Sequence, residues 1–71
     1  MPKYFFSVGE TEPPVDPNGD DLRDDDQALR AAIRIARALQ DIGAEYPRGT
    51  CLVVRNEEKE IVCQVPLTLD A

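Results

Sequence analysis

The stretch DDDQALRAAIRIARALQDI, residues 24–42, decides the fold, because it is the only long segment with a regular pattern. Asp24 is suited to the N-cap position, and Gln27 can reach back toward it in a capping box. Gly43 can adopt the left-handed conformation that ends many helices. The apolar stripe has the spacing of an amphipathic helix and comprises Ala28, Leu29, Ala32, Ile33, Ile35, Ala36, Leu39 and Ile42. The pattern predicts one helix over residues 24–42.

Three arginines follow the same rhythm on the opposite face of this helix: Arg30, Arg34 and Arg37. They can form a surface for phosphate groups or nucleic acid, or an ordinary solvated face on which Arg37 pairs with Asp41. No aromatic residue interleaves with them to stack on bases, and the chain carries a net charge of −6. The solvated face is therefore the favoured interpretation.

Residues 3–8, KYFFSV, have the composition of a strand. Because side chains alternate along a strand, Tyr4, Phe6 and Val8 share one face and should lie against the helix. Phe5 then points to the other side of the sheet.

Residues 50–55 and 60–65 are two further strands, joined by the turn at residues 56–59. A register with Arg55 opposite Glu60 and Val54 opposite Ile61 collects the apolar side chains on one face. That face comprises Leu52, Val54, Ile61, Cys63 and Val65. Cys51 and Cys63 then lie on opposite faces, so they cannot form a disulfide.

The remaining segments are short. Residues 9–23, GETEPPVDPNGDDLR, are acidic and rich in turn formers, and we expect a loop or a short edge hairpin with Val15 and Leu22 tucked inward. Beyond the helix, we expect Tyr46 to cover the end of the core. Leu67 and Leu69 should fold back over the edge of the core.

Together these elements predict a single α+β domain over residues 1–71, a three- to four-stranded, mainly antiparallel sheet with one amphipathic helix on one face. One helix leaves the other face open, exposing Phe5, Val53 and Val62. Contiguous apolar patches on small proteins mark interaction surfaces. We therefore expect a non-catalytic protein–protein interaction module that forms a homodimer or binds another protein through the open sheet face. The alternative is an accessory regulatory or nucleic-acid-associated module that uses Arg30, Arg34 and Arg37.

Composition restricts the setting. With 14 acidic against 8 basic residues, the chain is a poor candidate for a general nucleic-acid binder. No apolar run approaches the roughly 20 residues of a membrane span, and the N-terminal segment lacks the pattern of a signal peptide. Two cysteines do not make a disulfide framework. We expect a cytoplasmic protein that has no membrane association.

Candidate chemistry is sparse. Asp16, Asn18 and Asp20 match the start of a calcium loop, but the glycine is misplaced and Gln27 replaces the closing glutamate. The chain has no histidine to act as a general base, and it has no Gly-rich phosphate loop. We expect no metal, no cofactor and no enzymatic activity.

The motifs PKYFFSV at the start and VPL near the end, around an acidic turn and an Ala/Arg/Leu helix, resemble a family of short uncharacterised bacterial proteins. That family is a domain of unknown function, mainly alphaproteobacterial, whose members open Pro-Arg-Tyr-Phe-Phe-His and close Val-Pro-Phe. The resemblance implies a stand-alone cytoplasmic domain without an established activity. Ser7 stands where the family often has histidine. Lys59 stands where a turn glycine is frequent, which implies strain of about 1 kcal/mol.

Overall fold

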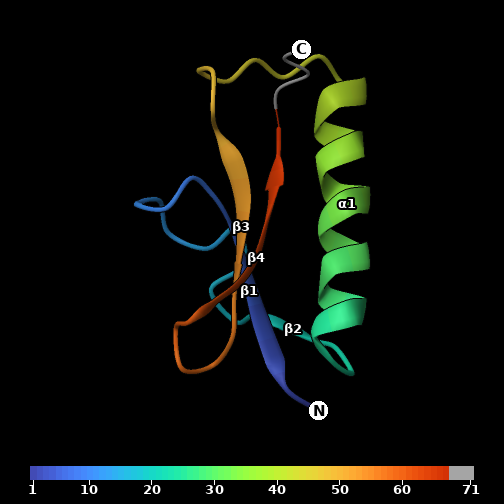
Figure 1. Cartoon of the computed structure of the whole chain (residues 1–71), viewed down its shortest axis with the longest axis vertical. Helices are drawn as coiled ribbons and strands as arrows, with labels where there is room; N and C mark the ends of the chain where they lie inside the picture. Colours follow the sequence, from blue (N-terminus) through green and yellow to red (C-terminus); the bar gives the residue numbers. More distant parts are fainter. Residues whose placement is uncertain (68–71) are drawn as a thin grey trace.

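The computed structural model describes residues 1–67 and contains one helix packed on a four-stranded sheet (Figure 1). In chain order the elements are β1 (Lys3–Val8), β2 (Asp20–Asp21), α1 (Asp25–Asp41), β3 (Cys51–Arg55) and β4 (Ile61–Pro66). The strand order is β2-β1-β3-β4, and every neighbouring pair is antiparallel. The α+β architecture expected from the sequence is confirmed.

The helix begins and ends where its capping residues predict. The Asp24 side chain accepts a hydrogen bond from the Gln27 N–H at 2.9 Å. The Gln27 side chain reaches back to the Arg23 N–H at 2.7 Å, one residue earlier than in a standard capping box. At the other end Gly43 has a φ of +75°, the left-handed conformation expected of it.

The helix contacts the sheet through a row of alanines. Ala28, Ala32 and Ala36 are buried, and the cluster they form with the sheet includes Tyr4, Phe6, Leu52, Val54 and Leu67. The helix buries a narrower stripe than the sequence pattern indicates. Leu29 and Ile33, predicted in the buried stripe, are 38% and 37% exposed, and Ile42 is 76% exposed.

Several peripheral residues lie where the sequence places them. Leu22 and Tyr46 pack against the core, and Leu67 closes its edge. Val15, expected to tuck inward, is instead 72% exposed, and its backbone N–H donates to the Phe6 C=O at the strand edge. Leu69 lies outside the described residues.

The predicted register of the last hairpin is wrong. Arg55 pairs with Ile61, and after an irregularity Val54 pairs with Cys63 and Leu52 with Val65. The connection between β3 and β4 is longer than predicted. The Asn56 side chain holds this turn by accepting hydrogen bonds from the N–H groups of both Glu58 and Glu60.

The irregularity is a bulge that leaves Val62 unpaired between Ile61 and Cys63. It reverses two expectations: Ile61, placed in the core, is 43% exposed, while Val62, placed on the open face, packs against the core. Beyond the bulge the register is shifted by two residues, so Cys63 and Val65 keep the face expected of them. Cys51 and Cys63 are both free thiols.

The sheet face opposite the helix is covered by the loop that follows β1. Phe5, Val53 and Val62 therefore do not form the exposed apolar patch that the sequence predicted. Figure 1 shows this loop (blue) on the side of the sheet away from α1. Val53 is 0% exposed, and Phe5 is partly buried. The Arg55 side chain donates to Ser7 Oγ at 3.4 Å and to the Glu10 C=O at 3.1 Å, which ties the loop down over the strands.

Candidate functional site

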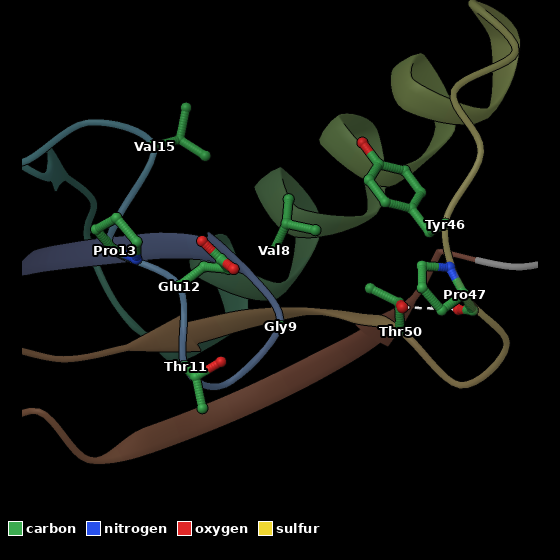
Figure 2. Close-up of a pocket in the computed structure, with 9 residues that line it drawn as sticks. All are labelled: Val8, Gly9, Thr11, Glu12, Pro13, Val15, Tyr46, Pro47 and Thr50. Carbon is green, nitrogen blue, oxygen red and sulfur yellow. Dashed lines mark hydrogen bonds between the residues drawn. The ribbon is translucent and has the colours of Figure 1, made fainter.

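An open groove of about 570 Å³ lies between two connections that are far apart in the sequence (Figure 2). One wall is the loop after β1, and the other is the connection between α1 and β3. The lining residues are mostly apolar or small, namely Val8, Gly9, Thr11, Glu12, Pro13, Val15, Tyr46, Pro47 and Thr50. Clefts with apolar walls and a few polar groups are the usual form of a binding site.

The wall formed by Pro47 is held by a tight turn. The Thr50 N–H and the Thr50 hydroxyl both donate to the Pro47 C=O, at 3.1 and 2.7 Å. Tyr46 packs against the core beside it, which orients its ring toward the groove. This wall is therefore preformed.

The floor of the groove carries a free strand edge at Val8. The Phe6 C=O accepts from the Val15 N–H at 2.7 Å on the outer side of β1, and the Gly9 N–H donates to Cys51 C=O at 2.9 Å on the side of β3. Backbone groups of a strand alternate in direction, so the N–H and C=O of Val8 face outward as those of Phe6 do. Within residues 1–67, β2 covers this edge only at Lys3 and Tyr4.

Glu12 is the charged residue in the groove lining. Its carboxylate points toward Val8 in Figure 2. Since the chain is also acidic as a whole, the groove favours cationic groups.

The structure also has a smaller apolar cavity of about 190 Å³. It lies between the helix and β1, and its lining comprises Tyr4, Phe6, Val15, Asp16, Asp20 and Ile35. Val15 lines both this cavity and the groove.

Tyr4 links β1 to the start of α1. Its hydroxyl donates to Asp25 Oδ1 at 2.6 Å. This hydrogen bond, together with desolvation and the negative charges of Asp25 and Asp24, raises the pKa of Tyr4 to about 12. The tyrosine therefore stays protonated, with a structural role.

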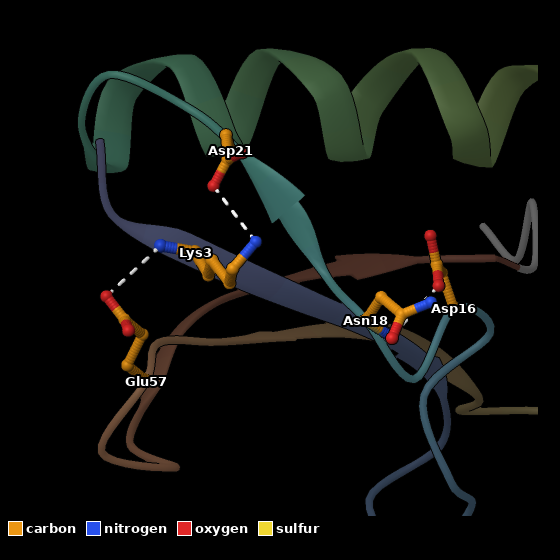
Figure 3. A network of polar contacts seen from close by, with 5 residues as sticks. All are labelled: Lys3, Asp16, Asn18, Asp21 and Glu57. Atoms are coloured by element: carbon orange, nitrogen blue, oxygen red, sulfur yellow. Dashed lines mark hydrogen bonds and ion pairs between the residues drawn. The ribbon is translucent and has the colours of Figure 1, made fainter.

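The acidic residues before the helix build the turn. Asp16 Oδ1 accepts a hydrogen bond from the Asn18 N–H at 2.9 Å. Asp21 forms an ion pair with Lys3 Nζ at 3.2 Å (Figure 3). The Lys3 N–H donates to Glu57 at 3.3 Å and joins the strand to the last hairpin. Within the described part of the chain, no three His, Cys, Asp or Glu side chains converge closely enough to hold a metal ion.

The structure separates the residues that the sequence suggested for an interface. Val53 is buried under the loop, Phe5 is partly covered by it, and Val62 lies on the bulge at the far edge. The three arginines of the helix remain exposed, and Arg30 pairs with Asp26 at 3.1 Å.

Sequence reasoning missed the groove. Both of its walls contain prolines, Pro13 and Pro47, but only the strand order reveals that the two connections converge beside Val8.

Cys63 lies partly buried on the helix side of the sheet. Desolvation and, to a lesser extent, the negative charge of Asp25 raise the pKa of its thiol. A raised pKa lowers the thiolate fraction, so Cys63 is a weak nucleophile.

Comparison with known proteins identifies one relationship. A family model described as a domain of unknown function, DUF6894, matches residues 3–68, and the chain belongs to this family. The resemblance to a domain of unknown function is thus confirmed, while the bacterial origin that it implied stays a prediction. No curated protein and no solved structure matches the chain. No helix within residues 1–67 is long and apolar enough to cross a membrane.

Proposed function

We propose that this member of a family without an assigned function is a non-catalytic protein–protein interaction module. Its groove binds an extended segment of a partner protein. The observation that carries the proposal is the outward-facing backbone of Val8 at the floor of a preformed, mostly apolar groove.

The geometry supports addition of a short strand. An extended peptide that pairs with Val8 gains main-chain hydrogen bonds, and its alternate side chains point to the apolar walls. Tyr46 offers a ring and Pro47 a rigid surface, both of which lose little conformational entropy on binding. Glu12 favours lysine or arginine in the bound segment.

The chemistry of the remaining residues supports a binding role over catalysis. The chain has no histidine, and burial raises the pKa of the Cys63 thiol, which makes it a weaker nucleophile. The two free cysteines favour a reducing compartment, so we place the domain in the cytoplasm.

Fluorescence anisotropy tests the groove with two labelled probes, the hexapeptides Val-Lys-Val-Lys-Val-Lys and Val-Glu-Val-Glu-Val-Glu. The basic probe should bind with a Kd below about 1 mM, and the acidic probe should bind more weakly. Glu12→Lys should weaken binding of the basic probe about fivefold, the effect of about 1 kcal/mol for an exposed ion pair. Ala38→Lys, which also adds positive charge but on the exposed face of the helix, is the control and should change the affinity less. Equal affinities for both probes, or no binding at 1 mM, would overturn the proposal.

The second candidate function uses the helix face with Arg30, Arg34 and Arg37. Its support is that Arg34 and Arg37 are exposed and form no ion pair with another described residue, whereas Arg30 is engaged by Asp26. A gel shift with a short duplex tests it. Binding that falls steeply with salt would favour this function, and no binding at low salt would dismiss it.

A further inference from the structure

We propose that two copies of this domain associate through the free edge of β4, around a two-fold axis beside Gln64, with their helices in contact through Leu29 and Ile33. This surface lies at the opposite edge of the sheet from Val8. The inference is independent of the groove.

The first support is the exposed backbone of β4, the last strand of the sheet. The Leu67 N–H donates to the Thr50 C=O at 3.0 Å, so Leu67 faces β3, and by alternation Val65 and Cys63 do too. Gln64 therefore directs its N–H and C=O away from the sheet. A strand added at this edge can form hydrogen bonds with both groups.

The second support is that the edge is compatible with one register of self-pairing. Pairing centred on Gln64 joins this residue to the same residue of the other copy by two reciprocal hydrogen bonds. Pro66 has no N–H, and Val62 belongs to the bulge, so regular pairing stops on both sides of the centre. A register shifted by one residue would pair Gln64 with Val62 or Pro66, and a register shifted by two would be centred on one of these two interruptions.

The third support is the absence of charge along the strand. The sequence of β4 is IVCQVP, without a lysine or an acid to keep other strands away. Two copies therefore bring no like charges together along β4, although each chain has a net charge of −6.

The fourth support is an apolar flank of the helix on the same side. Ile35 borders the cavity with Tyr4 and Phe6, so that flank of α1 faces β1. Leu29 and Ile33 lie on the other flank of the buried alanine row, toward β4, and both are more than one third exposed. They add side-chain burial to the short ladder of hydrogen bonds.

Light scattering coupled to size exclusion, over a range of concentrations, tests the proposal. The native chain should have twice the monomer mass of 7.9 kDa. Gln64→Pro removes an N–H that faces away from the sheet, so the variant should fold and its mass should halve. Ile33→Glu should halve the mass independently, because it places a charge between the helices. Ala38→Glu, elsewhere on the same helix, should remain a dimer.

Circular dichroism establishes that each variant is folded. A native chain that is monomeric at millimolar concentration would overturn the proposal. A dimer that persists in both Gln64→Pro and Ile33→Glu would overturn it as well, since the contact would then lie elsewhere. Loss of dimerisation should leave probe binding in the groove unchanged, which separates this inference from the proposed function.

Discussion

Gly19 lies so close to the ring of Phe5 that a β-carbon built on its backbone would be 2.8 Å from Phe5 Cε1. Gly19 also has a φ of +75°, a conformation that side chains disfavour. Through this contact, the end of the loop that leads into β2 packs against the sheet face opposite the helix. It explains why a face that the sequence leaves open is covered in the folded chain.

Gly19→Ala should therefore destabilise the domain. The left-handed conformation costs roughly 1–2 kcal/mol for a residue with a β-carbon, and the displaced Phe5 ring adds to this cost. Urea denaturation followed by circular dichroism measures the loss. An unchanged midpoint would mean that the loop does not hold this position.

Val53→Glu should unfold the domain. Val53 is fully buried, and an unpaired carboxylate there costs on the order of 3 kcal/mol or more. Small domains have little stability to lose. Far-ultraviolet circular dichroism should show loss of native structure at neutral pH. A folded variant would instead show that the loop swings away from the sheet and leaves this face accessible.

Lys59→Gly should stabilise the domain by about 1 kcal/mol. Lys59 is the non-glycine residue with positive φ among those described, at 68°, and glycine adopts this conformation without strain. The family resemblance implied a glycine at this turn, and a glycine there would adopt the positive φ without strain. Thermal unfolding of both proteins under identical conditions should show a higher Tm for the variant. A lower Tm would mean that the side chain of Lys59 makes compensating contacts.

Tyr4→Phe should lower stability at neutral pH by removing the bond to Asp25. The pKa of Tyr4 is raised to about 12 from 10.0, so its folded state holds the proton more tightly than its unfolded state. This contribution is complete below pH 10 and is lost as the pH rises toward 12. The difference in urea midpoint between the native chain and Tyr4→Phe should shrink over that range. A constant difference would rule out the bond as its source.

The sequence predicted the elements well and the surfaces poorly, for identifiable physical reasons. The helix ends followed from Asp24 and Gly43, because capping is local chemistry. The hairpin register was wrong because Asn56 binds two backbone N–H groups, which lengthens the turn and introduces the bulge at Val62. Pattern alone could not distinguish a register shifted by two residues, since such a shift keeps the side chains beyond the bulge, those of Cys63 and Val65, on their faces.

The candidate site escaped sequence reasoning because it depends on tertiary arrangement. Val8 was correctly placed on the helix side of β1, but whether its backbone faced a neighbour depended on where the following loop rejoined the sheet. That loop bonds at Phe6 and again at β2, and it leaves Val8 free. The periodicity of the sequence does not indicate where the edge of a strand is left unpaired.

The most direct test of the binding role is an ¹⁵N nuclear magnetic resonance titration with the Val-Lys-Val-Lys-Val-Lys probe. The amide proton of Val8 should move downfield and saturate as it gains a hydrogen bond, together with shifts at Thr11, Tyr46 and Thr50. The amides of β4 should stay in place. Saturable shifts confined to other surfaces, or no shift at Val8 at saturating probe, would contradict the account.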